Sequence, residues 1–265
     1  MIIDLDKIND DYQGEIDRFS LYSGADIYSK ELNLFFHQPK VIDFGFIGEE
    51  FYLKILSLLS LKKEMFDKEN LSEEEREEIR QLSNFDFVLT TLDNDKALKN
   101  KFNDLLLIMF PTYSTEINFK KGYFSFTYNS PLPNNKEIVV YITKLNYNIF
   151  NFYIKSILDI TKDEKKEFNP MSDLSKRIAN DLERARKRVS GKSGEDKKFS
   201  LFTNAVSCVS AGASIPINII LHNYTIIQLF DNFQRFKKYE DYHQSIDSIY
   251  AGAQDVEVKN WLGDI

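Results

Sequence analysis

The chain has 265 residues, of which 43% are hydrophobic and 14% aromatic, enough apolar material for a sizeable core in one large domain or two small ones. The net charge of −7 argues against a dedicated nucleic-acid-binding protein, because such proteins usually carry a basic excess. The single cysteine, Cys208, excludes an intrachain disulfide and fits a reducing compartment, so we expect a cytoplasmic protein.

The first 30 residues are polar and acidic, and we expect a loosely ordered arm or a short helix there. The segment ELNLFF, which starts at Glu31, predicts a short strand that ends before Pro39. Gly48 and two glutamates then precede apolar residues at helical spacing, up to about Lys63. Acidic residues at a helix start are favoured by the helix dipole, so the pattern predicts a helix.

Two more helices are predicted before residue 111. Ser72 and Glu75 form a capping-box pattern that opens a mostly charged helix. The next segment, DNDKALKNKFNDLLLIMF, places five apolar residues on one helical face and ends at Pro111. These five are Leu98, Phe102, Leu105, Leu106 and Met109.

The middle of the chain changes its hydrophobic period. Apolar and polar residues alternate along GYFSFTYN and IVVYI, and the connection SPLPNN has the composition of a turn. We predict a β-hairpin, which TEINFK extends to a three-stranded meander. Helical spacing then returns, with core-facing residues at Ile149, Phe152, Tyr153, Ile157 and Ile160.

The last hundred residues are helical by pattern. We expect an exposed charged helix over 172–189, a flexible linker over 190–198, a short helix in KFSLFTNAVSCVSAGA and a long final helix. The predicted fold class is α+β, mainly helical, with a small antiparallel hairpin or meander in the N-terminal half and an all-helical C-terminal part. The predicted organisation is an acidic arm (1–30), an α+β domain (31–165), a charged helix and linker (166–198) and a helical C-terminal domain (199–265).

The final helix carries an apolar stripe whose members are three or four residues apart. The stripe consists of Ile226, Phe230, Phe233, Phe236, Tyr239, Tyr242, Ile246 and Ile249. The expected solvated side holds Asp231, Gln234, Lys237, Lys238, Glu240 and Asp241, Gly252 ends the pattern, and Trp261 follows. Two interpretations stay open: the stripe is ordinary core, or the short C-terminal part leaves apolar surface for a partner or another copy.

Patterns for catalysis and cofactor binding are missing from the sequence. It has no GxxxxGK[ST] or GxGxxG phosphate-binding loop and no GxSxG elbow, and GFIGEE lacks the Lys and Ser/Thr of a P-loop. His37, His222 and His243 are scattered without metal-ligand spacing. We therefore expect no enzyme activity, no cofactor and no metal. No segment reaches the roughly 18 uncharged apolar residues of a membrane span, so we expect no membrane partner.

A basic run, RARKRVSGKSGEDKK, lies over residues 184–198. It fits a solvated helix, a contact for an acidic protein, or a phosphate and nucleic-acid contact. Aromatic residues for base stacking are missing from the run, which makes nucleic acid the least favoured of the three.

The C-terminal stretch resembles a group of small cytoplasmic proteins of siphophages and prophages, encoded beside the tape-measure gene and described as tail assembly chaperones or tail proteins. The similar features are Tyr224-Thr225, Gln228-Leu229-Phe230-Asp231, Phe233, Arg235, Tyr239 to Tyr242, Gly252 and Trp261. The segment HQPKVIDFGFIGEEFY also resembles that group.

This resemblance implies a non-enzymatic tail morphogenesis protein that covers apolar stripes of the tape-measure protein until tail-tube subunits replace it, and that self-associates. A structural component of the finished tail or neck is the alternative, and an accessory protein that contacts nucleic acid through 184–198 is a third. The partner-binding candidates are Phe230, Phe233, Phe236, Tyr239, Tyr242, Ile246 and Trp261.

Overall fold

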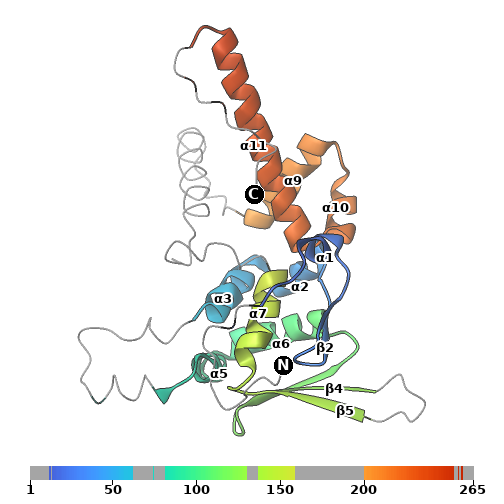
Figure 1. The fold of residues 1–265 in the computed structure, drawn as a ribbon, viewed down its shortest axis with the longest axis vertical. Helices are drawn as coiled ribbons and strands as arrows, with labels where there is room; N and C mark the ends of the chain where they lie inside the picture. Colours follow the sequence, from blue (N-terminus) through green and yellow to red (C-terminus); the bar gives the residue numbers. More distant parts are fainter. Residues whose placement is uncertain are drawn as a thin grey trace.

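The computed structural model describes residues 12, 14–61, 74, 81–129, 137–158, 200–253, 256 and 258. The N-terminal half holds α1 (Arg18–Ser23), β1 (Ile27–Ser29), β2 (Leu34–Phe36), the 3-10 helix η1 (Val41–Asp43), α2 (Phe44–Ile47), α3 (Glu49–Leu59), α5 (Asn84–Asn94), α6 (Lys96–Met109), β3 (Ser114–Asn118), β4 (Tyr123–Asn129), β5 (Glu137–Ile142) and α7 (Tyr147–Ile157). The C-terminal part holds α9 (Leu201–Ala213), α10 (Ile217–Asn223) and α11 (Ile226–Tyr250). The predicted α+β fold with a helical C-terminal part is confirmed (Figure 1).

The predicted meander is a three-stranded antiparallel sheet in the order β3-β4-β5. Phe124 and Phe126 of β4 and Ile142 of β5 are buried, as the alternating pattern predicts. The ring of Phe124 contacts Phe85 of α5, Phe102 of α6 and Phe150 of α7. These three helices therefore pack on one face of the sheet (Figure 1).

Helix α6 matches its sequence pattern closely. Its buried residues are the five that the spacing predicts, and the Asp95 side chain caps its first turn by accepting a hydrogen bond from the Leu98 N–H at 2.9 Å. Helix α3 carries both predicted glutamates in its first turn but ends at Leu59 rather than near Lys63. In α7, Ile149, Tyr153 and Ile157 are buried and Phe152 is half-buried.

The sequence pattern did not predict α5 as a helix separate from the charged helix that Ser72 was expected to open. Ser83 and Asp86 form a capping box in which each side chain accepts a hydrogen bond from the other residue's N–H, and this box starts a new helix at Asn84. Ser72 and Glu75, Ile160, the predicted helix 172–189, the linker 190–198 and Trp261 all lie outside the described residues.

The N-terminal arm enters the fold before residue 31. Helix α1 is a short helix, as one interpretation of this segment expected. Strand β1 pairs with β2, with Ile27 opposite Phe36, so strand pairing starts upstream of the predicted domain boundary. Ile27 and Phe36 are both buried, which ties the arm to the main core.

One continuous cluster of buried side chains joins the N-terminal half to the C-terminal helices. The ring of Phe202, at the start of α9, lies 5.0 Å from Tyr52 of α3 and 5.9 Å from Phe44 of α2. It also lies 5.8 Å from Phe230 of α11. Helix α11 leaves this junction and projects away from the body of the molecule (Figure 1).

Candidate partner-binding surface

The first turns of α11 are held by contacts from far away in the sequence. Thr225 and Gln228 form a capping box at the start of the helix. The Gln228 side chain also donates to the Tyr22 carbonyl at 2.6 Å, and the Val41 N–H donates to the Tyr224 carbonyl at 2.9 Å. The start of α11 is thus fixed between α1 and η1.

Helix α9 is held to the N-terminal half by a charged cap. The Glu49 carboxylate accepts a hydrogen bond from the Ser200 hydroxyl at 2.6 Å and another from the Leu201 N–H. A carboxylate at a helix N-terminus satisfies an otherwise unpaired N–H group and is favoured by the helix dipole. Glu49 therefore positions α9, on which α11 packs.

The apolar stripe of α11 becomes more exposed along the helix. Ile226 is 1% exposed and belongs to the core, and Phe230 and Phe233 pack against that core while half-buried. Tyr239 is 38% exposed and Ile249 is 43% exposed. The stripe is therefore core at its start and open surface at its end.

The other described partner candidates on α11 lie between these two extremes. Phe236, Tyr242 and Ile246 are half-buried, and Tyr250, which the stripe did not include, is 85% exposed. The ring centroid of His243 lies 4.3 Å from that of Tyr239 and 5.6 Å from that of Tyr242, and both pairs meet edge to face along the helix itself. We call the segment from Phe236 to Tyr250 the distal half of α11.

The prediction that Asp231 lies on the solvated side of α11 is wrong. The Asp231 side chain is only 11% exposed and lies 2.9 Å from Arg235 and 3.8 Å from Arg18 of α1. Asp231 faces α1 because α1 packs against the first half of α11, a contact that the pattern of α11 alone does not contain. Glu240 and Asp241, further along, are exposed as predicted, whereas the other predicted solvated residues are half-buried: Gln234, Lys237 and Lys238.

A groove of about 190 Å³ runs between α9 and the middle of α11, where the distal half begins. It is lined by Val209, Gly212 and Ala213 of α9 and by Asn232, Arg235, Phe236 and Tyr239 of α11. Gly212 lets the two helices approach, because a Cβ at this position would overlap the ring of Phe236. Val209, Gly212 and Ala213 on one wall and the rings of Phe236 and Tyr239 on the other suit the insertion of apolar side chains from a partner helix, and Asn232 and Arg235 add polar groups to the second wall.

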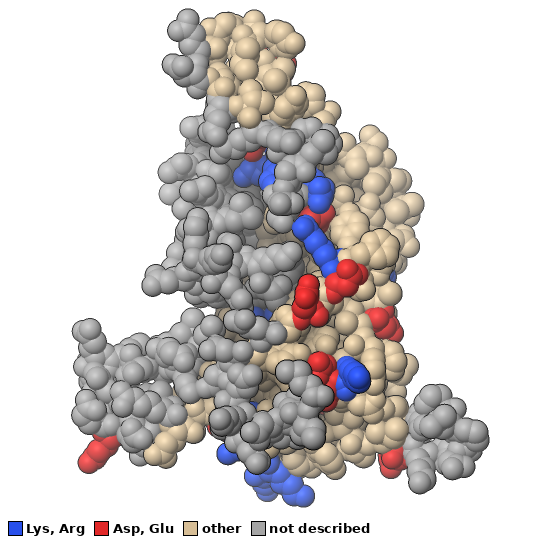
Figure 2. All heavy atoms as spheres, viewed as in Figure 1, with Lys and Arg blue, Asp and Glu red and all other residues tan. Residues whose placement is uncertain are grey.

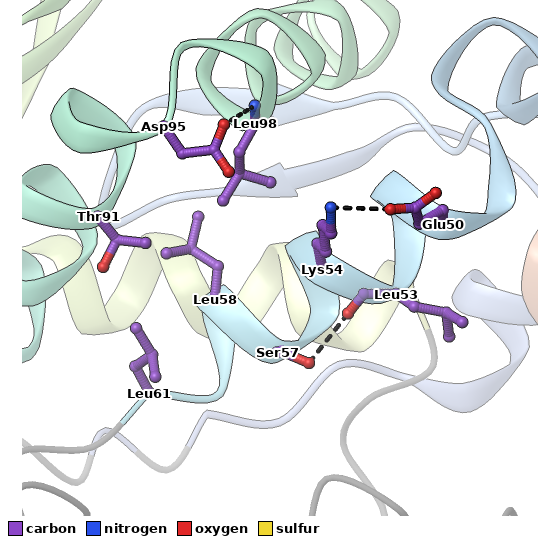
Figure 3. A pocket seen from close by; sticks show the side chains of 9 residues that line it. All are labelled: Glu50, Leu53, Lys54, Ser57, Leu58, Leu61, Thr91, Asp95 and Leu98. Atoms are coloured by element: carbon purple, nitrogen blue, oxygen red, sulfur yellow. Dashed lines mark hydrogen bonds and ion pairs between the residues drawn. The ribbon is translucent and has the colours of Figure 1, made fainter.

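A second hollow, of about 520 Å³, lies between α3, α5 and α6 (Figure 3). Leu53, Leu58, Leu61 and Leu98 supply its apolar lining. Its charged groups are engaged: Lys54 pairs with Glu50 at 2.9 Å, and Asp95 caps α6. The hydrogen bond to Glu50 raises the pKa of Lys54, which therefore stays a cation. This hollow offers apolar contact rather than an acid–base pair.

Further chemistry is not assembled in the described part of the chain. No group of three or more His, Cys, Asp or Glu side chains there could hold a metal ion. Cys208 is half-buried within α9, and Ser214 is the left-handed cap of that helix. Among the described helices none is by itself long and apolar enough to span a membrane, although α9 and α10, bent by 119°, together pass that test on length and composition.

Residues 194–265 match a family model described as the YomV second domain. The match covers all of α9, α10 and α11. Neither a curated protein nor a solved structure matches the chain. The C-terminal region is therefore similar to this domain, and the likeness falls on the helices that form the groove.

Proposed function

We propose that this chain is a non-enzymatic, prophage-associated protein that binds a helical polypeptide through the distal half of α11 and the adjoining groove. The match of residues 194–265 supports the prophage context, since YomV is a Bacillus prophage-region protein. The observation that carries the binding role is the rising exposure of the stripe, from 1% at Ile226 to 43% at Ile249.

The physical argument concerns the cost of exposed apolar surface. Large exposed apolar side chains at helical spacing normally mark a contact site, because leaving them in water forgoes burial free energy of about 25 cal/mol per Å². An amphipathic helix in a partner buries its own stripe when it lies beside such a face. The distal half of α11 supplies two exposed positions of this kind, Tyr239 and Ile249, and the half-buried Tyr242 and Ile246 lie between them on the same stripe.

We further propose that the partner is the tape-measure protein of a tailed phage and that this chain acts as a tail assembly chaperone in the host cytoplasm. A tape-measure protein is a long helical chain whose apolar stripes need cover until tail-tube subunits arrive. Half-buried aromatic residues on the chaperone suit an exchangeable contact, because they add apolar area without the large buried interface of an obligate complex.

The test is calorimetry of the folded full chain with helical fragments of the tape-measure protein encoded in the same prophage. Replacing Tyr239 and Ile246 by Ser is expected to weaken binding by tenfold or more, because apolar contacts at the centre of an interface dominate affinity. Tyr141→Ser is the control, since this residue is 50% exposed and belongs to β5, which lies at the opposite end of the molecule from α11 (Figure 1). Folded protein that binds no fragment contradicts the proposal.

Mass spectrometry of purified virions separates the chaperone from a structural tail or neck protein. A chaperone leaves before maturation and is missing from the particles. A structural component is present in a fixed ratio to the tail-tube protein, and finding it so would reject the chaperone role while leaving the helix-binding surface in place.

A further inference from the structure

The chain has no charged residue over an unusually long stretch of sequence that contains α9 and α10. Residues 199–230 contain no Asp, Glu, Lys or Arg, although the whole chain is 28% charged. Figure 2 shows the result: the surface over α9 and α10, at the upper right, is uncharged on this face, whereas the middle of the molecule carries both signs. This surface is distinct from the charged distal half of α11, which contains Lys237, Lys238, Glu240 and Asp241.

Apolar side chains stand out from this uncharged surface at one corner. Ile217 is 48% exposed and Ile219 is 44% exposed, and both lie on α10 next to the exposed Pro216. We call Ile215, Pro216, Ile217 and Ile219 the α10 corner. The inner side of α10 is anchored by Ile220, which is fully buried, so the exposed isoleucines are not needed to hold the helix in place.

The α10 corner begins at a turn that local hydrogen bonds hold in place. Ser214 adopts a left-handed conformation with φ of 54°, which turns the chain sharply between α9 and α10. The Ser210 hydroxyl donates to the Ile215 carbonyl at 2.7 Å, and the Ile215 N–H donates to the Ser210 carbonyl at 3.1 Å. A surface held in this way loses little conformational entropy when something docks on it.

We propose that the α10 corner is a self-association surface, on which a second copy of this chain docks by two-fold symmetry. In such a dimer the same patch meets itself, so any charge on it would face an identical charge. Two copies with a net charge of −7 repel each other, and a patch without ionised residues is the place where they meet at the lowest electrostatic cost. This inference goes beyond the proposed binding of a client helix, and it uses a different face.

A membrane is the rival occupant, and the charge pattern disfavours it. Surfaces that lie on membranes usually combine apolar residues with Lys or Arg that attract anionic lipid. The α10 corner contains no Lys or Arg, and neither does the surrounding sequence from 199 to 230. The chain as a whole is acidic. A second copy needs no such attraction.

The first experiment measures the mass of the full chain by analytical ultracentrifugation over a range of concentrations. The wild type is expected to move from 31.0 kDa towards twice that mass as concentration rises, because a small apolar corner gives a weak dimer. Ile219→Glu is expected to raise the dimer dissociation constant by tenfold or more, because the interface would bury two facing carboxylates. Ile249→Glu is the matched control: it is 43% exposed, lies on α11, and should leave the dimer unchanged.

A mixing experiment excludes misfolding as the reason for lost association. Ile219→Glu and Ile219→Lys are each expected to be monomeric alone, and an equimolar mixture is expected to recover the dimer because opposite charges then face each other. Wild-type protein that stays at 31.0 kDa at every concentration overturns the proposal, and so does a dimer that survives Ile219→Glu. Wild-type protein that stays monomeric but binds phosphatidylcholine vesicles, with loss of binding in Ile219→Glu, also overturns it and assigns the corner to a lipid surface.

The same variants keep this inference separate from the proposed function. Ile249→Glu should weaken binding of the tape-measure fragments while the dimer persists. Ile219→Glu should abolish the dimer while each monomer still binds the fragments. Failure of one proposal therefore leaves the other standing.

Discussion

The ring of Phe236 lies against the backbone of Gly212, and both residues line the groove between α9 and α11. A Cβ on residue 212 would overlap three atoms of that ring. The relationship sets the packing of the two helices and positions Phe236 as one wall of the groove. It makes Gly212 a residue that is exposed and yet intolerant of a side chain.

In Gly212→Ala, overlap with the ring of Phe236 is expected to cost about 1–3 kcal/mol of folding free energy. Ala normally stabilises a helix by roughly 1 kcal/mol relative to Gly, so we expect a net loss of stability. Gly45→Ala is the control: Gly45 lies in α2, a Cβ added there would meet nothing within 4 Å, and the change should be neutral or stabilising. Urea denaturation measures both variants, and adding Phe236→Leu to Gly212→Ala should restore part of the lost stability.

Glu49 makes a second specific prediction, because its carboxylate caps α9 from a different part of the chain. Glu49→Ala should lower the free energy of unfolding by about 1–2 kcal/mol, the usual cost of losing a charged helix cap. The neighbouring Glu50 points into solvent, with a side chain that is 74% exposed and paired with Lys54 in the next turn. Glu50→Ala should therefore cost much less, and equal losses from the two changes would contradict the capping role.

The elements predicted well from the sequence are those whose pattern is local. The buried face of α6 repeats every three or four residues, and the strands β4 and β5 alternate, so their period identifies them without knowledge of the rest of the fold. Helix α11 was predicted for the same reason, together with its end near Gly252.

The parts that the sequence did not predict depend on contacts between distant residues. Asp231 looks solvated on the wheel of α11, and only the docking of α1, with Arg18 at 3.8 Å, explains why it is covered. The carboxylate of Glu49 caps α9 through Ser200, which lies 151 positions further along the chain. A local signal did exist for α5, because Ser83 and Asp86 are spaced as a capping box.

Tyr147 predicts how stability depends on alkaline pH. Burial raises the pKa of its phenol above the ordinary value of about 10, and the folded protein therefore holds a proton that the unfolded chain releases. The free energy of unfolding is therefore unaffected by this group below pH 10. Above pH 10 it falls by about 1.4 kcal/mol per pH unit because of Tyr147 alone. Burial and the Glu31 carboxylate also raise the pKa of Tyr12, to about 12, which adds to the same trend.

Tyr147→Phe tests this origin. The Tyr147 hydroxyl is buried and has no hydrogen-bond partner among the described residues, so its removal should raise stability at neutral pH by about 1 kcal/mol. Thermal unfolding between pH 8 and pH 11 should also show a shallower decline than in the wild type. Tyr250→Phe, at a position that is 85% exposed, should match the wild type at every pH. A decline unchanged in Tyr147→Phe would assign the alkaline sensitivity to other groups.

The gradient along α11 predicts that stability and partner binding separate at the two ends of one stripe. Phe230 contacts Phe202 and packs against the core, so Phe230→Ala should cost about 2–3 kcal/mol of folding free energy, somewhat below the loss for a fully buried Phe. Tyr239 is 38% exposed, so Tyr239→Ala should change stability by less than about 1 kcal/mol. In calorimetry with tape-measure fragments, Tyr239→Ala should lose affinity while it remains folded. If both variants lose stability equally and neither changes binding, then the whole stripe is core and the partner surface lies elsewhere on the molecule.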